Sequence, residues 1–180
     1  MKQKTCKVCK TKFTPERPFQ TWCSYDCAIE LAQKRIETKK EKDRIKASRE
    51  LKEAKERNKT RAKWMKEAQT VFNAFIRARD KDLPCISSGR FTGAFDAGHY
   101  RSVGSCPELR FNELNCHRQT VHDNQHLHGN LIEYRKRLID RIGLDKVEWI
   151  ESKHEPKHYS IEDLKQIKAE YKQKLKEIAK

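Results

Sequence analysis

Four of the seven cysteines lie in two pairs within the first 27 residues. The spacing is Cys6-x2-Cys9, then a longer loop, then Cys23-x3-Cys27. Each pair can bind one side of a tetrahedral Zn²⁺ ion through its thiolates, and the loop between the pairs closes the site. Because four protein ligands leave no coordination position for water, the pattern predicts a structural zinc site rather than a catalytic one. The alternative is four unrelated free thiols.

A second group of polar residues lies between Cys85 and Asn130 and could do acid–base or metal chemistry. Neutral imidazole can take a proton near pH 7, and carboxylate, amide and imidazole groups can bind divalent metal ions. Taken singly, each residue also has a structural interpretation as a loop histidine, a turn-capping amide, a loop brace or part of a polar helix face. The candidates are Asp96, His99, Asn115, His117, Asn124 and His128.

The elements that must position these residues can be predicted from composition and periodicity. Residues 28–83 contain no Gly and no Pro, which is typical of a long helix, and Leu83-Pro84 should end it. Residues 33–63 carry 14 Lys and Arg against 6 Asp and Glu, which predicts a solvated basic helix. Apolar residues then return at helical spacing and predict a packed face: Trp64, Ala68, Val71, Phe72, Phe75 and Ile76.

The C-terminal third has the pattern of two helices. Leu131, Tyr134, Leu138 and Ile142 share one face, and Gly143 is a plausible stop. Ser160 and Asp163 predict a capping-box start for the last helix. The apolar stripe of that helix is Ile161, Leu164, Ile167, Tyr171, Leu175 and Ile178.

Composition limits the class of protein. Of the 180 residues 36% are hydrophobic and 37% are charged, so small modules are expected rather than one large core. The formal charge of +15 indicates a polyanionic partner, most often nucleic acid. Apolar runs are too short for a membrane span or a signal peptide, so we expect a cytoplasmic protein with reduced thiols.

The order of these motifs resembles the HNH, or ββα-metal, nuclease pattern, with a His ending the first strand, an Asn in the loop and a His or Asn opening a helix. More closely, nearly the whole chain resembles the lambda NinG (Rap) family of phage recombination nucleases. The segments that carry the resemblance are the cysteine pairs, the basic helix, Leu83-Pro84-Cys85, Asp96-Ala-Gly-His99-Tyr100, Leu109-Arg-Phe-Asn112-Glu113, Asn115-x-His117-x-Gln119, Gly129-Asn130 and Ile167-Lys-Ala-Glu-Tyr171.

The resemblance implies an α+β fold with three parts. These are a zinc-finger module at residues 1–30, a basic helical linker at 31–63, and an HNH-like nuclease domain with C-terminal helices at 64–180. It also implies a divalent-metal-dependent endonuclease that cleaves branched DNA, such as D-loops and Holliday-type junctions, in the cytoplasm of a host cell. A second copy of the chain and phage or host recombination proteins are further expected partners.

The same resemblance suggests residue roles. His99 would be the general base, Asn115 would orient its ring, and His117 would be a metal ligand or phosphate contact. A catalytic Mg²⁺ or Mn²⁺ would be bound by Asp96, Asn124 and His128, the last two at i and i+4 on one helix face. The expected nucleic-acid contacts are Lys7, Lys10, Arg101 and Arg110.

The chain departs from the family pattern at a second zinc site, for which relatives typically supply cysteines at positions 85, 88, 120 and 123. Cys85 is present, but Ser88, Thr120 and Asp123 replace the other three. Hydroxyls are poor zinc ligands, so the site is either metal-free or uses substitutes such as Cys106, Cys116, His117 or His122. The lost thiolates leave open a non-catalytic DNA-binding or architectural protein, and an RNA-binding accessory protein ranks last.

Overall fold

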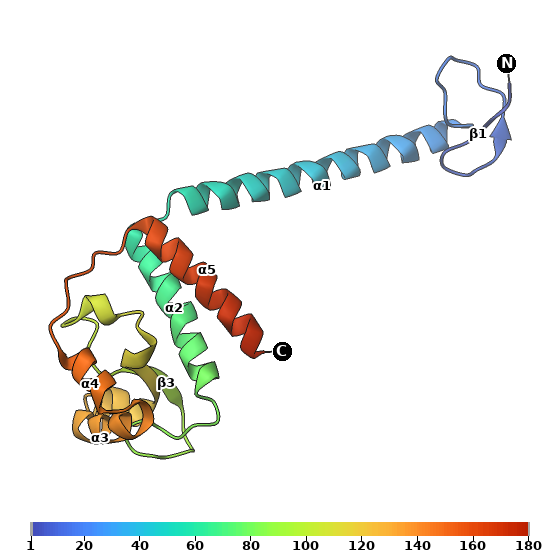
Figure 1. Ribbon diagram of the computed structural model, residues 1–180. Coiled ribbons are helices and arrows are strands. Elements are labelled where there is room, and N and C mark those ends of the chain that lie inside the picture. Colours follow the sequence, from blue (N-terminus) through green and yellow to red (C-terminus); the bar gives the residue numbers. More distant parts are fainter. Residues whose placement is uncertain (1, 180) are drawn as a thin grey trace. The chain divides into compact units, whose positions relative to one another are not determined.

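The fold is mixed α+β, and the computed structural model describes residues 2–179 (Figure 1). The chain divides into two compact units between Lys59 and Thr60. Within residues 2–179, no helix combines the length and the apolar character that crossing a membrane requires.

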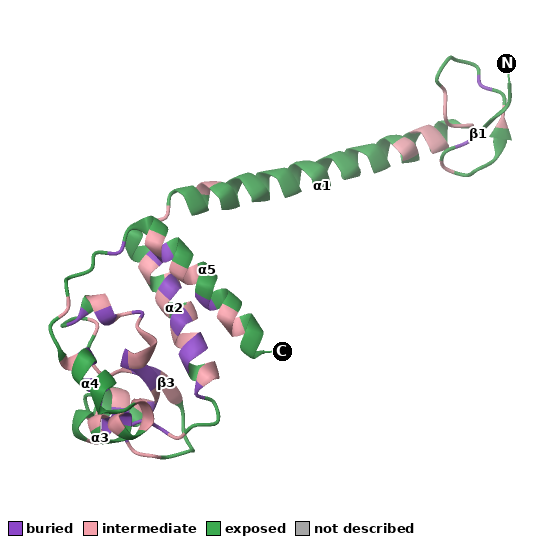
Figure 2. Ribbon diagram, viewed as in Figure 1, coloured by how far each residue is buried: buried purple, intermediate pink, exposed green. Residues whose placement is uncertain are grey.

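The first unit consists of a small hairpin and one long helix. Strand β1 (Lys4–Thr5) pairs antiparallel with β2 (Lys12–Phe13), and helix α1 runs from Tyr25 to Arg57. No residue of α1 is buried, as the almost continuous green ribbon in Figure 2 shows. Ion pairs one turn apart, such as Lys34–Glu30 and Arg49–Glu53, stabilise the exposed helix. The solvated basic helix predicted for residues 33–63 is confirmed as far as Arg57.

The prediction of one helix over residues 28–83 is wrong, because the chain breaks at residues 58–60. The side chain of Thr60 accepts a hydrogen bond from the backbone N–H of Lys63 and starts a second helix, α2, at Arg61–Arg79. A threonine N-cap can begin a helix without any Gly or Pro nearby, so composition gave no sign of the break. Helix α2 ends at Asp80, before Leu83-Pro84, and the predicted domain boundary at residue 64 falls inside it.

The first of two cores in the second unit lies between α2, helix α5 (Ile161–Ile178) and a small sheet. Helices α2 and α5 lie side by side (Figure 1). The Ser160–Asp163 capping box is formed, as predicted. Leu164 and Tyr171 are buried, whereas Ile161 and Ile178 at the helix ends are exposed. The buried cluster is Trp64, Ala68, Phe72, Phe75, Ile76, Ala97, Phe111, Cys116, Tyr159, Leu164 and Tyr171.

The sheet has two antiparallel strands, β3 (Phe95–His99) and β4 (Cys116–Thr120), with His99 opposite Cys116 and Gly98 opposite His117. Two short 3-10 turns, η1 (Pro107–Leu109) and η2 (Glu113–Asn115), lie in the connection between them. A π-helical segment, η3 (His122–His126), follows β4.

Helices α3 (Leu131–Ile142) and α4 (Leu144–Glu151) close a second core around Ile86 and Leu109. Gly143 ends α3 with φ of +90°, which confirms the predicted stop, and α4 begins directly after it. The second core therefore packs the chain that follows the sheet against the loop that joins its strands.

Candidate functional site

The four N-terminal cysteines converge as their spacing predicted. Cys6 and Cys9 lie in the turn of the β1–β2 hairpin, Cys23 precedes α1, and Cys27 is in its first turn. All four Sγ atoms lie within 4.8 Å of one another, with 3.3 Å between Cys9 and Cys23. Tetrahedral zinc with Zn–S bonds of about 2.3 Å needs sulfur atoms roughly 3.8 Å apart. The cluster can therefore hold a metal ion such as zinc, and in residues 2–179 no other group of three or more His, Cys, Asp and Glu side chains can.

His99 ends β3 and lines a cavity of about 450 Å³ in the second unit. Asn124 and His128 also line this cavity, and so do Arg101 and Ser102 from the segment after β3. The cavity thus brings together a strand end, the following segment and the turn after β4, which the sequence separates by almost thirty residues.

The backbone holds the imidazole of His99 in one orientation. Its Nε2 atom lies 2.9 Å from the carbonyl oxygen of Arg110. Because a carbonyl can only accept, Nε2 carries the proton and the lone pair is on Nδ1, which lies 3.7 Å from Cys116 Sγ. Burial lowers the pKa of His99 below its ordinary value of 6.5, against the opposing effect of the Arg110 carbonyl. The ring is therefore neutral at pH 7, as a general base must be.

Asn115 does not orient the His99 ring through its side chain, which corrects the expected role. Asn115 is fully buried, and its Nδ2 donates to the carbonyl oxygens of Arg101 (3.0 Å) and Leu109 (3.3 Å). Its Oδ1 accepts from the backbone N–H of Arg101 at 2.8 Å. Asn115 instead braces the segment that follows β3, and with it the wall of the cavity.

His117 lies inside the protein rather than on the cavity wall, so the expected role as ligand or phosphate contact does not fit its position. It is 3% exposed, and its Nδ1 lies 3.3 Å from the hydroxyl oxygen of Tyr134. Burial, reinforced by the charge of Arg79, lowers the pKa of His117 to about 3. His117 is thus a neutral core residue at physiological pH.

The three predicted ligands of a catalytic ion have a different arrangement from the one expected. Asn124 is in η3, but His128 lies beyond its end with φ of +50°, so the two do not share a helix face. Both nevertheless line the cavity, and Asn124 Nδ2 donates to Asp96 Oδ2 at 3.1 Å. A carboxylate, an amide oxygen and an imidazole are donor types that suit Mg²⁺ or Mn²⁺.

The four predicted nucleic-acid contacts fall into two places. Lys7 and Lys10 are exposed beside the cysteine cluster. Arg101 lines the cavity and donates from Nη1 to the carbonyl oxygen of Glu151 at 3.0 Å. Arg110 donates from Nη1 to Gln69 Oε1 at 3.2 Å, while its carbonyl holds His99.

The positions that would form a second zinc site do converge, but as a hydrogen-bonded cluster centred on Asp123. Its Oδ2 accepts from Ser88 Oγ at 2.6 Å, from Cys85 Sγ at 3.3 Å and from the Thr120 hydroxyl, and its Oδ1 accepts from Asn130 Nδ2 at 3.0 Å. Burial opposes ionisation, yet the hydrogen bonds from Ser88 and Thr120 outweigh it and lower the pKa of Asp123 to about 2. The suggested substitutes Cys106 and Cys116 are buried in the two hydrophobic cores instead.

Comparison with known proteins gives the family. The family model for the bacteriophage lambda NinG protein matches residues 1–180. The chain belongs to the NinG family. It is 45% identical to protein NinG of Escherichia phage lambda, over 98% of this chain and 93% of that one. The NinG proteins of Escherichia phage 933W and Salmonella phage P22 are each 44% identical, over 98% of this chain and 94% of theirs. No solved structure matches.

Two features that organise the cavity of this NinG chain had no sequence signal. The first is the Arg110 carbonyl, because a backbone acceptor leaves no trace in residue types. The second is Glu151 at the end of α4, whose carboxylate accepts from the Tyr100 hydroxyl and from Arg135. The backbone carbonyl of Glu151 also accepts a hydrogen bond from Arg101, a cavity residue 50 positions earlier in the sequence.

Proposed function

We propose that this NinG family protein is a divalent-metal-dependent endonuclease that cuts branched DNA, such as D-loops and Holliday-type junctions, during phage recombination. The single observation that carries the proposal is the state of His99. A neutral imidazole, held by a backbone carbonyl through Nε2, lies on the wall of a cavity that also contains Arg101, Asn124 and His128.

The cavity residues, with Asp96 beside Asn124, can be given roles in phosphodiester hydrolysis. His99 accepts a proton from the attacking water while the water oxygen bonds to phosphorus and the bond to the leaving sugar oxygen breaks. Arg101 holds a non-bridging phosphate oxygen through its guanidinium. Asp96, Asn124 and His128 would hold Mg²⁺ or Mn²⁺, which supplies stabilisation of the negative charge on the phosphate and leaving oxygen.

The order of elements around His99 also supports a nuclease of the HNH type. The base ends β3, the pairing strand β4 follows after a loop, and the cavity residue Asn124 lies in the helical segment directly after β4. The preference for branched DNA rests on the resemblance to the NinG family of recombination nucleases. The basic hairpin and α1 supply phosphate contacts that do not depend on sequence.

The test is cleavage of labelled D-loop, four-way junction and linear duplex DNA in Mg²⁺ or Mn²⁺. His99→Ala should lower the rate on branched DNA by about 10²- to 10⁴-fold, the usual contribution of a general base, with DNA affinity unchanged. His126→Ala is the matched control, because His126 is an exposed histidine of the same unit that does not line the cavity.

Two results would contradict the proposal. Equal cleavage by wild type and His99→Ala would mean that His99 is not the base. Salt-sensitive binding of branched DNA without cleavage in any of the metals would favour the alternative, a non-catalytic DNA-binding protein. The Asp123 cluster favours that alternative, because hydrogen bonds to a carboxylate occupy the positions at which the family resemblance implies a second zinc site.

A further inference from the structure

Phe19, in the loop between the two cysteine pairs, has an environment that folding alone does not explain. Its side chain is 91% exposed, more than any other large hydrophobic side chain in residues 2–179. Its backbone has φ of +67°, a left-handed conformation that costs a bulky residue free energy. A glycine or asparagine would make the same turn more easily and would leave no apolar ring in water.

The loop around Phe19 is held in place by hydrogen bonds from one side chain. Gln20 Oε1 accepts from the backbone N–H groups of Glu16 (2.8 Å) and Arg17 (3.2 Å), and its Nε2 donates to the Trp22 carbonyl at 3.0 Å. The backbone N–H of Lys7 donates to the carbonyl of Thr21 at 2.9 Å, which ties the loop to the cysteine turn. The exposed ring is therefore presented from a fixed backbone, and little conformational entropy is lost when it meets a partner.

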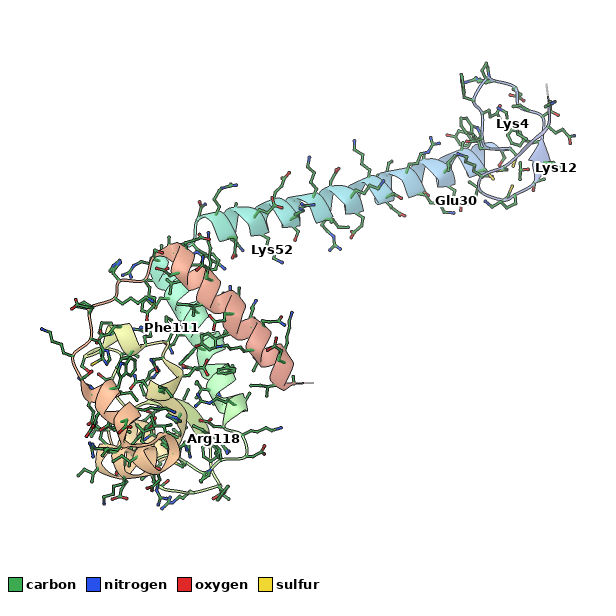
Figure 3. The ribbon with its side chains drawn as sticks, viewed as in Figure 1. Lys4, Lys12, Glu30, Lys52, Phe111 and Arg118 are labelled. Carbon is green, nitrogen blue, oxygen red and sulfur yellow. The ribbon has the colours of Figure 1, made fainter. Side chains whose placement is uncertain are left out.

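The composition of the module that carries Phe19 favours a nucleic acid as the partner. Residues 2–24 contain six Lys and Arg and a single acidic residue, Glu16. Lys4 and Lys12 project from the paired strands β1 and β2 (Figure 3). An aromatic ring among cations suits single-stranded nucleic acid, in which bases stack on the ring while phosphates contact the cations. In a paired duplex the faces of the bases are already stacked on one another.

We propose that Phe19 stacks on an unpaired nucleobase where branched DNA opens into single strands. This inference deepens the proposed function and rests on its DNA-binding half, because it assigns recognition of unpaired DNA to the cysteine-cluster module. The cations of the module contact the phosphates of both paired and unpaired DNA. Phe19 adds stacking on an unpaired base, which a fully paired duplex cannot offer.

The experiment measures binding by the full zinc-loaded chain, without Mg²⁺ or Mn²⁺, so that cleavage plays no part. The probes are a duplex with a short single-stranded gap that contains 2-aminopurine and the same sequence fully paired. Phe19→Ala and Phe19→Leu should weaken binding to the gapped probe about 5- to 150-fold, the range for loss of one base–aromatic stack, and abolish quenching of 2-aminopurine. Phe19→Trp should keep both, and affinity for the paired probe should change less than twofold in every variant.

The controls separate stacking from folding and from plain hydrophobic contact. Zinc content must equal one ion per chain in each variant, and Leu51→Ala, which removes a side chain 57% exposed on α1, should bind like wild type. Wild-type affinity in Phe19→Leu would overturn the proposal, because leucine keeps apolar contact without an aromatic face. An equal loss on both probes would overturn it as well. If His99→Ala cleaves DNA like wild type, the interpretation of the Phe19 binding results does not change, because binding is measured without cleavage.

Discussion

His99 and His117 lie on the paired strands β3 and β4, one register position apart, yet their surroundings differ. Both have pKa values lowered by burial, but His99 lines the cavity while His117 is enclosed beside Tyr134. A lowered pKa favours the neutral ring in each case, which suits core packing at His117 and the proton transfer that we propose for His99. The residue type alone therefore does not distinguish a base from a core residue.

Acid should destabilise the second unit through His117. The unfolded chain binds a proton on this histidine near pH 6.5, whereas the folded chain resists until about pH 3, so stability falls as the pH drops through this window. Between pH 7.5 and 5.5 His117 should account for about 1.4 kcal/mol of the loss, and His99, whose pKa burial also lowers, adds to it. Urea unfolding at both pH values, followed by tryptophan fluorescence, measures it.

His117→Gln supplies the comparison, because glutamine can still meet the Tyr134 hydroxyl but does not titrate. Its stability should fall by about 1.4 kcal/mol less than that of wild type over the same pH interval. Parallel losses in the two proteins would show that His117 is not the group responsible. The lowered pKa values of Asp80 and Asp123 act only below about pH 4, outside this interval.

At this scale, the sequence predicted which residues gather around the cavity better than it predicted their contacts. Asp96, His99, Asn124 and His128 were singled out, and the structure places His99, Asn124 and His128 around one cavity. The contacts of Asn115 with Arg101 and Leu109 depend on how the connecting loop closes, which no local pattern encodes.

At the scale of elements, predictions held where the controlling signal was local. The Ser160–Asp163 capping box and the Gly143 stop each depend on a few neighbouring residues, and both are present. The break before α2 and the π-helical form of η3 were missed. The first lies between the Asn58 C-cap of α1 and the Thr60 N-cap of α2, and the second lies where Asp123 packs between β4 and the Cys85 turn. That packing places His128 beyond the end of η3.

The Asp123 cluster joins the Cys85 turn to the end of β4 through hydrogen bonds. Its carboxylate accepts hydrogen bonds from Cys85, Ser88 and Thr120, the other three positions of the second zinc site that the family resemblance implies. We therefore expect the full chain to bind one zinc ion, at the N-terminal cysteines. Metal analysis of purified protein should give a ratio of one, and Cys27→Ala should lower it toward zero. A ratio of two in wild type would contradict a metal-free cluster.

Introducing cysteines at the other three positions tests whether the same geometry can bind a second zinc ion. The side chains at 85, 88, 120 and 123 already converge, so Ser88→Cys, Thr120→Cys and Asp123→Cys together should raise the ratio to two zinc ions per chain. Asp123→Ala should bind one zinc, like wild type, and be less stable to urea by about 1–3 kcal/mol, because the Ser88 and Thr120 hydroxyls lose their charged acceptor. No second zinc in the triple variant would mean that the turn cannot reach tetrahedral geometry.

Across the whole molecule, charge and chemistry are divided unequally between the two units. Residues 1–59 contain eighteen Lys and Arg against nine Asp and Glu, whereas residues 60–180 contain 23 against 17. The cavity with His99 belongs to the second unit, and the exposed helix α1 to the first. The first unit thus has the stronger attraction for a polyanion, and the second has the site where we expect a bond to be cut.

This division predicts that α1 governs the salt dependence of DNA binding. The side chains of α1, Lys52 among them, project outward along the helix (Figure 3), so each lysine can release counterions on reaching a phosphate. Changing Lys39, Lys42 and Lys52 to glutamine should reduce the slope of log affinity against log salt by about 0.9 for each lost duplex contact, or about 2.7 in all. The same three positions changed to arginine should leave the slope unchanged. An unaltered slope in the glutamine variant would instead assign the phosphate contacts to the cysteine hairpin or to the second unit, and α1 would then only connect them.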